Sequence, residues 1–281
     1  MKLLDYDLGK RTLVVGILNV TPDSFSDGGK INNLDKALKH AKKMADEGAD
    51  IIDIGGESTR PGAKKITAEE EIKRVLPVFK KIVKEVNVPI SIDTYKSEVA
   101  KKCLENGASM INDITGLRGD EKLADVVKEY NVPICIMHMK GMPSDMQKDP
   151  YYEDVIKEIK DFLKKQSNYA IKKRIKKENI IVDPGIGFGK RTGSGIEDNC
   201  TILANIREFK KLGYPVLIGA SRKTFIGNIS NEKNLSKYDR LEGSIAAAVI
   251  SSLNGADIVR VHDVKETMHA LDVLNCMKKS I

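Results

Sequence analysis

Residues 13–29 have the sequence LVVGILNVTPDSFSDGG, an apolar run that ends abruptly at Asn19 and continues into a loop of hydroxyls, carboxylates and glycines. The run is apolar at successive positions, which is typical of a strand buried on both faces of a parallel sheet. The same arrangement recurs seven more times along the chain, and each strand-like segment ends in a polar side chain. This recurrence predicts a barrel with a polar pocket at one end and favours an enzyme.

Amphipathic stretches with helical spacing separate the predicted strands. Residues 34–47, for example, place Leu38, Ala41, Met44 and Ala45 on one helical face. Regular alternation of strand and helix indicates an α/β architecture. Length alone would also allow two smaller domains, but eight units in 281 residues match a (β/α)8 TIM barrel, and no linker is visible. We therefore expect a single domain over residues 1–281, with strands at 12–18, 51–55, 88–92, 109–114, 133–137, 180–182, 215–219 and 257–261.

Composition narrows the class of protein. Hydrophobic residues make up 41% of the chain while aromatic residues make up 5% and Trp is absent, so aliphatic side chains must fill the core. A net charge of +7 could indicate a nucleic-acid partner. Acidic residues are interleaved with the lysines, however, and aromatic stacking residues are sparse, so a solvated lysine-rich surface is the better interpretation.

The sequence also favours a cytoplasmic location. The longest apolar runs have the length of strands, so no membrane span is expected. The N-terminal residues lack the apolar region of a signal peptide. The four cysteines are far apart and form no C-x-x-C pair, which indicates reduced thiols.

Polar side chains close all eight predicted strands. Strands often end near water, so one such residue would mean little, but in this fold the catalytic groups lie at the carboxyl ends of the strands. Eight ends that are mostly amide or carboxylate therefore favour a functional site. The residues are Asn19, Asp53 with Glu57, Asp93, Asn112 with Asp113, His138, Asp183, Ser221 and His262.

The seventh and eighth strand ends suggest an anion site. Arg260 and His262 are two residues apart on a strand and so share a face. Arg222 and Lys223 follow the seventh strand, where such barrels customarily bind phosphate. These basic residues either cap a surface loop or bind phosphate or diphosphate, with Lys223 able to reach a neutral carbonyl instead.

Asn19 has two interpretations. Asparagine often caps turns, but a neutral oxygen beside a diphosphate also suits Mg²⁺, which takes few protein ligands and keeps phosphate oxygens and waters. The chain has no His/Cys spacing typical of a permanent metal site. We therefore expect any metal to arrive with the substrate.

Asp93, Asn112 and Asp183 end the third, fourth and sixth strands. They could pair with lysines and stabilise the barrel, or they could recognise a flat heterocycle. An aminopyrimidinone edge offers N–H donors and a carbonyl, which carboxylate, amide and ammonium groups satisfy together. Buried without such partners, these groups would cost about 1–3 kcal/mol each, which favours a polar ligand. Phe25 and Phe188 could stack on it or belong to the core.

The motifs resemble those of the dihydropteroate synthases, a family of pterin-binding enzymes. Residues 19–29 and 53–62 are similar to the first two motifs of the family, and the resemblance covers nearly the whole chain. The later motifs follow in order at 93–94, 111–113, 183–190, 221–223 and 260–264. The resemblance implies condensation of 6-hydroxymethyl-7,8-dihydropterin diphosphate with 4-aminobenzoate to 7,8-dihydropteroate and diphosphate, in folate biosynthesis.

The resemblance also implies roles for individual residues. The pterin would contact Asp93, Asn112, Met137, Asp183 and Lys223. The diphosphate would contact Asn19, Arg260 and His262, with Mg²⁺ on Asn19. The 4-aminobenzoate site would comprise Phe25, Thr59, Arg60, Pro61, Phe188, Ser221 and Thr224. A homodimer formed through barrel helices is implied as well.

The implied chemistry agrees with the residues. A primary aromatic amine is a weak nucleophile, so the reaction depends on departure of the diphosphate, which Mg²⁺ and cationic side chains stabilise. Anionic Asp93 would help the pterin to carry positive charge at its methylene carbon. No dedicated general base is needed in this dissociative reaction.

The sixth loop departs from the family pattern, because residues 191–196 intervene before the next helix. Two other functions are alternatives to this one. A methyltransferase that uses methyltetrahydrofolate would keep the pterin-facing residues but would not need a diphosphate site. A basic RNA-binding or scaffold protein would present aromatic platforms on a basic face and bind with a steep salt dependence.

Overall fold

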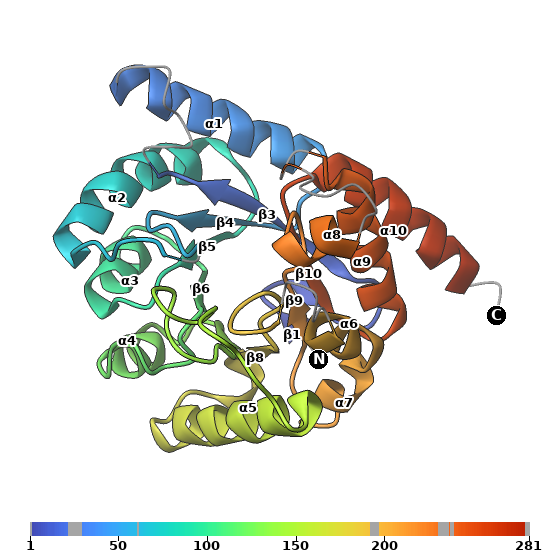
Figure 1. The fold of residues 1–281 in the computed structure, drawn as a ribbon. Coiled ribbons are helices and arrows are strands. Elements are labelled where there is room, and N and C mark those ends of the chain that lie inside the picture. Colours follow the sequence, from blue (N-terminus) through green and yellow to red (C-terminus); the bar gives the residue numbers. More distant parts are fainter. Residues whose placement is uncertain are drawn as a thin grey trace.

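In the part of the chain that the structure describes, eight parallel strands form a nearly closed barrel surrounded by helices (Figure 1). The structure is a computed structural model that describes residues 2–21, 30–60, 62–191, 197–229, 236 and 239–278, with only the backbone at 30–32. The strands are β3 (Leu13–Asn19), β4 (Ile51–Gly55), β5 (Ile90–Asp93), β6 (Met110–Asp113), β7 (Ile134–Met137), β8 (Ile180–Asp183), β9 (Leu217–Ile218) and β10 (Ile258–Val261). The predicted (β/α)8 barrel is confirmed.

The strand order is β8-β7-β6-β5-β4-β3-β10-β9. An isolated parallel bridge between Val182 and Val216 then brings the last strand beside the first, with Val182 N donating to Pro215 O at 2.9 Å. We call this contact between β8 and β9 the seam. The barrel is therefore closed by far fewer backbone contacts at the seam than at the β3–β4 pair, which is in register over five residues.

The helices form an outer layer whose apolar faces cover the strands (Figure 1). Helix α2 shows how the sequence produces such an element: Thr67 Oγ1 accepts from Glu70 N at 3.1 Å and caps the helix, while Val75, Phe79 and Ile82 are buried on one face. The helices are α1 (Lys30–Asp46), α2 (Ala68–Glu85), α3 (Ser97–Leu104), α4 (Leu123–Tyr130), α5 (Val155–Lys172), the 3-10 helix Lys177–Asn179, α6 (Glu197–Ala204), α7 (Ile206–Lys210), α8 (Thr224–Ile229), α9 (Leu241–Leu253) and α10 (Val264–Lys278).

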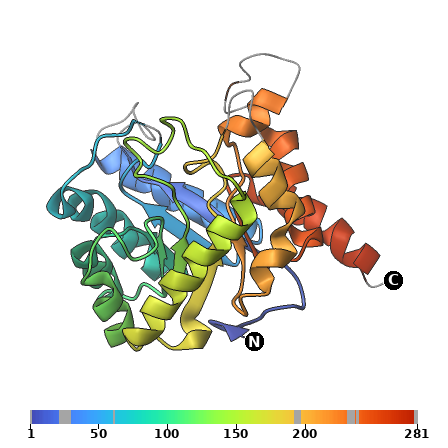
Figure 2. The same cartoon turned by 60° about the horizontal axis from the view of Figure 1, so that its bottom comes forward.

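The N-terminal hairpin closes the end of the barrel from which the strands start (Figure 2). It consists of the antiparallel strands β1 (Lys2–Leu3) and β2 (Tyr6–Asp7). Leu3 is buried in the barrel interior, and Tyr6 Oη donates to Asp50 O at 2.9 Å. Arg11 Nη1 adds an ion-paired hydrogen bond to Asp50 Oδ2 at 2.8 Å. The hairpin does not cover the opposite end of the barrel, where the strands finish, and this end can hold a functional site.

The inward-facing residues form two layers. Successive side chains of a strand alternate between faces, so every second residue points into the barrel. The layer near the hairpin is apolar and consists of Leu3, Leu13, Val15, Ile51, Met110, Cys135, Ile181, Leu217 and Ile258. Two residues further along the strands, the inward positions are occupied by Asp53, Asn112, Met137, Asp183 and Arg260. The period of the strand thus places a polar layer on an apolar floor.

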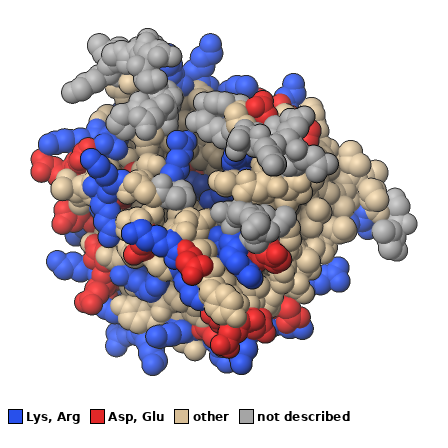
Figure 3. All heavy atoms as spheres, in the orientation of Figure 1, with Lys and Arg blue, Asp and Glu red and all other residues tan. Residues whose placement is uncertain are grey.

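Charge is mixed over the outer surface. Figure 3 shows Lys and Arg side chains spread around one face of the molecule with Asp and Glu between them. Several of these charges pair across helices, such as Lys42 with Glu85 at 2.6 Å. In the described part of the chain, no helix is both long enough and apolar enough to cross a membrane.

Candidate active site

A buried group of charged residues lies at the carboxyl ends of β4, β5, β6 and β10. Asp53 Oδ2 accepts from Arg260 Nε at 2.6 Å and from Asn112 Nδ2 at 2.9 Å, and Arg260 Nη2 donates to Asp93 Oδ2 at 2.8 Å. The structure therefore brings together three of the predicted site residues, Asp93, Asn112 and Arg260. Asp53 connects them, although sequence analysis gave it no role beyond a polar strand end. Its inward-facing position, two residues after buried Ile51, was the signal that could have identified it.

Burial moves the pKa values of three charged residues at the site, Asp93, Asp183 and Lys223, towards neutral pH. It raises the pKa of Asp93 to about 7, against the opposing charge of Arg260. It also raises the pKa of Asp183 to about 6, although Gly185 N donates to Asp183 Oδ1 at 2.7 Å. The pKa of Lys223 is lowered to about 8 by burial and then by Arg260. Perturbed groups of both signs in one place are typical of a functional site.

An apolar wall lies beside the charged residues. Met137 and Phe188 belong to one buried cluster with Ile114, Met139 and Met146. The ammonium of Lys223 lies 3.8 Å from the centroid of the Phe188 ring. A flat heterocycle needs an apolar surface for its face and polar groups at its edge, and this arrangement offers both.

The loop after β8 is fixed by a buried lysine that sequence analysis did not select. Lys190 is fully buried, and its Nζ donates to Pro184 O at 2.7 Å and to Phe188 O at 3.0 Å, and lies 2.8 Å from His138 Nδ1. Burial holds the pKa of Lys190 well below its usual range. Gly185 has φ +70°, and a Cβ there would lie 1.9 Å from His138 O. The loop conformation therefore requires both the glycine and the ammonium.

Ser221 and His262 form a pair at the ends of β9 and β10. His262 N donates to Ser221 Oγ at 3.2 Å, and Ser221 Oγ lies 3.0 Å from His262 Nδ1. The serine oxygen accepts from the backbone and can also donate its proton to Nδ1, an arrangement in which Nε2 carries the imidazole proton. Burial lowers the pKa of His262 to about 3, helped by the charges of Arg222 and Arg260. The imidazole is therefore neutral and, in this arrangement, offers an Nε2–H donor.

Of the two basic residues after β9, Lys223 lies beside Asp93 and Asp183, whereas Arg222 lies beside His262 and Asp263. Arg222 has φ 57° and donates from Nε to Asp263 Oδ2 at 3.0 Å and from Nη2 to Asp263 Oδ1 at 2.5 Å. This ion pair ties the loop to the end of β10. Of the two interpretations that the sequence allowed, this contact fits the one in which Arg222 caps a surface loop.

The remaining predicted residues lie nearer the rim. Asn19 ends β3 beside Gly55 of β4 and is partly exposed. Thr59 and Arg60 lie between β4 and α2, and Thr224 begins α8 and is exposed. Phe25, Pro61 and residues 192–196 of the extended sixth loop lie outside the described residues. Among the described residues of the predicted 4-aminobenzoate set, Arg60 lies near enough to His262 for its charge to help lower the pKa of that imidazole.

Comparisons with known proteins agree with this geometry. A family model described as pterin binding enzyme matches residues 15–262. The dihydropteroate synthase of Clostridium beijerinckii is 48% identical over 267 residues, which are 95% of this chain and 94% of that protein.

Solved structures are similar over almost the whole fold. A dihydropteroate synthase from Clostridium difficile, crystallised in the presence of pteroic acid, is 48% identical with a TM-score of 0.89, covering 97% of this chain and 98% of that one. The Xanthomonas albilineans enzyme with 4-aminobenzoic acid is 42% identical with a TM-score of 0.88, covering 95% of this chain and 93% of that one.

The fold and the site define a pterin-binding enzyme built on a TIM barrel. Its buried carboxylates, amide and ammonium stand on the inner ends of the strands, where this fold carries out its chemistry. The chain belongs to the dihydropteroate synthases, which are transferases.

Proposed function

We propose that this chain condenses 6-hydroxymethyl-7,8-dihydropterin diphosphate with 4-aminobenzoate, giving 7,8-dihydropteroate and diphosphate in folate biosynthesis. The observation that carries this proposal is the grouping of charged and amide side chains, Asp93, Asn112, Asp183 and Lys223, beside the apolar cluster of Met137 and Phe188. The carboxylates accept from the ring N–H groups of the pterin, and Lys223 and the Asn112 amide complete the edge. Membership of the family supports the reaction.

The diphosphate would lie beside Asn19, Arg260 and His262. Arg260 brings a buried positive charge, and the neutral imidazole of His262 brings an Nε2–H donor. Such preorganised donors stabilise the negative charge that grows on a departing diphosphate.

The residues fit a Mg²⁺ ion that binds with the diphosphate. Among the described residues, no three His, Cys, Asp or Glu side chains are placed together to hold a metal. The amide oxygen of Asn19 is the hard, neutral ligand that Mg²⁺ accepts when phosphate oxygens and waters supply the rest. When bound, Mg²⁺ would neutralise charge on the leaving diphosphate.

The chain's residues then act on the charge that develops. The bond between the methylene carbon and the diphosphate oxygen breaks, and the diphosphate keeps the electron pair. The pterin spreads the resulting positive charge, which the anionic form of Asp93 stabilises at close range. The amine nitrogen of 4-aminobenzoate forms the new bond and loses a proton, for which no dedicated base is required.

The 4-aminobenzoate would lie towards the rim, framed by residues of several loops. Phe188 contributes an aromatic face, and the pair of Ser221 and His262 marks the boundary with the diphosphate. The full set proposed is Phe25, Thr59, Arg60, Pro61, Phe188, Ser221 and Thr224.

The decisive test is diphosphate release by the purified protein with dihydropterin diphosphate and Mg²⁺, with and without 4-aminobenzoate. Release that requires the amine and yields dihydropteroate supports the proposal. Tight pterin binding without condensation would instead favour the methyltransferase alternative. Asn19→Ala should raise the Mg²⁺ concentration needed for half-maximal rate at least fivefold; normal Mg²⁺ dependence would remove Asn19 from the metal role.

We also propose that the chain acts as a single domain over residues 1–281 and forms a homodimer in the cytoplasm. Ile250 and Leu253 on α9 and Val273 and Met277 on α10 are large hydrophobic residues that are 45–63% exposed. They are three or four residues apart on adjacent helices, which supports an apolar stripe suited to a second copy. Light scattering should give twice the chain mass, and Leu253→Lys should give monomers; a monomeric unsubstituted protein would refute the dimer.

A further inference from the structure

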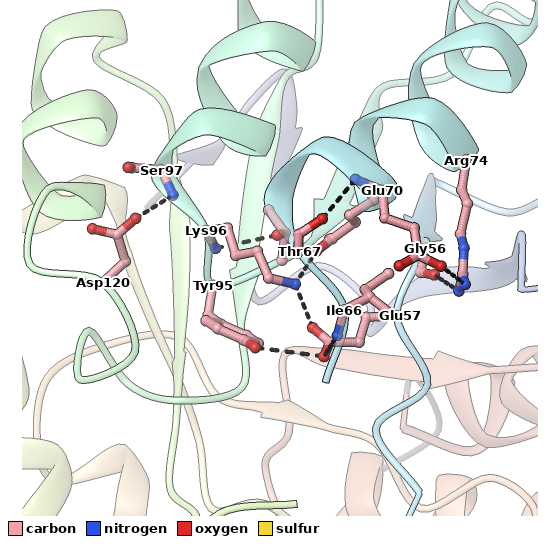
Figure 4. Close-up of polar contacts among 12 residues, drawn as sticks. Gly56, Glu57, Ile66, Thr67, Glu70, Arg74, Tyr95, Lys96, Ser97 and Asp120 are labelled. Atoms are coloured by element: carbon pink, nitrogen blue, oxygen red, sulfur yellow. Dashed lines mark hydrogen bonds and ion pairs between the residues drawn. The ribbon is translucent and has the colours of Figure 1, made fainter. Parts of the chain in front are cut away.

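Lys96 connects the two ends of the loop between β4 and α2, although it lies on the next strand connection. Figure 4 shows its side chain pointing to the carboxylate of Glu57. Nζ donates to Glu57 Oε2 at 2.6 Å and also contacts Glu71 Oε2. Glu57 follows β4 and Glu71 lies in the first turn of α2. The side chains of Lys96, Glu57 and Glu71 are 12%, 9% and 1% exposed, respectively, so they form a largely buried ionic group.

Glu57 in turn joins the beginning and the end of the loop between β4 and α2. Its Oε1 accepts from Ile66 N at 3.2 Å and from Tyr95 Oη at 3.5 Å (Figure 4). The carboxylate therefore joins the first and last parts of the loop over nine residues. Arg74 Nη1 donates to Gly56 O at 3.1 Å and fixes the residue just before. The backbone that leads to Thr59 and Arg60 thus starts from a rigid point.

Stability alone is a weak explanation for this group. Burying two carboxylates and one ammonium costs desolvation energy that their attraction often does not exceed. Burial raises the pKa of Glu71, against its contact with Lys96. Burial alone would lower the pKa of Lys96, but the hydrogen bonds that it donates to Glu57 and Glu71 raise it instead. Lys96 is therefore charged at neutral pH, and its main effect is to fix where Glu57 lies.

We propose that Lys96 is a positioning residue that acts through Glu57 to hold Thr59 and Arg60 where 4-aminobenzoate binds. Lys96 itself touches no proposed substrate group. Thr59 and Arg60 follow Glu57 by two and three residues, so they lie within about 7–11 Å of it along the chain. A shift of Glu57 would therefore move Thr59 and Arg60 as well. The inference rests on the proposed function, specifically on the placement of 4-aminobenzoate beside this loop.

The role makes a prediction that a purely structural brace does not. If Lys96 only braced α2 against α3, its loss would lower stability and weaken both substrates alike. If it positions the loop, the loss should fall mainly on 4-aminobenzoate, because the pterin residues Asp93 and Asn112 have their own hydrogen bonds to Arg260 and Asp53. Two readouts separate these cases: the KM for each substrate, and hydrogen exchange at the Ile66 amide.

Lys96→Met removes the ammonium and keeps most of the side-chain length. We expect the KM for 4-aminobenzoate to rise at least tenfold while affinity for a pterin lacking the diphosphate stays within twofold. The Ile66 amide should exchange at least tenfold faster, since Glu57 is no longer held against it. Lys101→Met, at an exposed position on α3, makes the same charge change and should leave all three quantities unchanged.

Glu71→Gln is the matched control within the group. The substitution weakens the contact between Lys96 and α2 but keeps the contact between Lys96 and Glu57. It should therefore lower the melting temperature with little change in the KM for 4-aminobenzoate. If Lys96→Met does not fold, Glu57→Gln carries the test through a threefold or greater rise in Ile66 exchange and in KM.

Particular outcomes would overturn the inference. A folded Lys96→Met protein with KM for 4-aminobenzoate within twofold of the unsubstituted protein, or with equal loss of pterin affinity, would do so. Unchanged Ile66 exchange would also do so, even in an active enzyme. An unsubstituted protein that forms no dihydropteroate would instead refute the proposed function, and the exchange measurement distinguishes the two failures.

Discussion

Lys223 lies with its ammonium 3.8 Å from the centre of the Phe188 ring, so the loops after β8 and β9 meet at the site. A cation over an aromatic face is attracted by about 0.5–2 kcal/mol, depending on exposure to solvent. Gly187 makes the approach possible, because a Cβ there would lie 3.1 Å from Lys223 Cδ. The ammonium is thereby held against the apolar wall that would receive the pterin.

Pterin affinity should follow a bell-shaped dependence on pH. As pH rises through about 6 and then about 7, Asp183 and Asp93 ionise and become full acceptors. As pH rises through about 8, Lys223 loses its proton and with it the charge that it offers the pterin. Calorimetry with a pterin that lacks diphosphate, from pH 5 to pH 10, should place the maximum between about 7 and 8.

Lys223→Met should abolish the basic limb of that profile and weaken binding at least tenfold at pH 7.5. A substituted protein that keeps both the affinity and the basic limb would show that Lys223 does not contact the pterin.

Asp183→Asn should separate stability from binding. The folded-state pKa of Asp183 is about 6 against an ordinary value of 3.8, so the ionised native state is disfavoured. The stability linked to this group is present below pH 3.8 and is lost as pH rises to about 6. Asparagine keeps an oxygen for Gly185 N and carries no charge.

Urea unfolding at pH 8 should therefore show Asp183→Asn to be more stable than the unsubstituted protein by about 1–3 kcal/mol. The difference should disappear near pH 3.5, where both side chains are neutral, while pterin affinity falls at least tenfold. Equal stability at pH 8 would contradict the buried, ionised carboxylate.

Ser221→Ala should impair the diphosphate more than the pterin. Without the serine proton on Nδ1, the imidazole of His262 can place its own proton there and turn an acceptor towards the diphosphate. We expect a three- to tenfold loss of affinity for dihydropterin diphosphate, measured by competition, with unchanged affinity for the pterin alone. Equal losses for both ligands would mean that the serine shapes the whole site.

Lys190→Met should destabilise the protein by about 2–4 kcal/mol, because the carbonyls of Pro184 and Phe188 would lose their hydrogen-bond donor while remaining buried. Denaturant unfolding would measure this change. Lys122→Met, at an exposed position before α4, is the matched control and should change stability by less than about 0.5 kcal/mol. A Lys190→Met protein as stable as that control would show that the loop does not depend on the buried ammonium.

The fold could be predicted largely because most strands are apolar over most of their length. The bounds differ by one or two residues, most at strand starts, where the sequence suggested 88, 133 and 215 but the strands begin at Ile90, Ile134 and Leu217. Proline explains much of this difference: Pro89, Pro133 and Pro215 have no N–H to donate to the ladder. Their carbonyls still accept from Ile52, Ile111 and Val182.

The site was predictable only in part. Asp93, Asn112 and Asp183 could be selected as candidates because each is the last or next-to-last residue of a strand. Lys190 could not, since a lysine among glycines normally faces water, and its acceptors come from residues 138, 184 and 188 that only the tertiary fold assembles. The Lys96 group was missed for the same reason, because Glu57 and Glu71 are 39 and 25 residues away in sequence.

The seam between β8 and β9 has a consequence for how the protein responds to its ligands. Asp183 at the end of β8 and Lys223 after β9 lie on opposite sides of this seam, where the two strands pair through one isolated bridge. A pterin that contacted both residues would link the two edges of the barrel. As the ligand concentration rises, a larger fraction of the protein carries a bound pterin, and the barrel should become more resistant to opening between β8 and β9. The protein should therefore be most stable when it is saturated with its ligand.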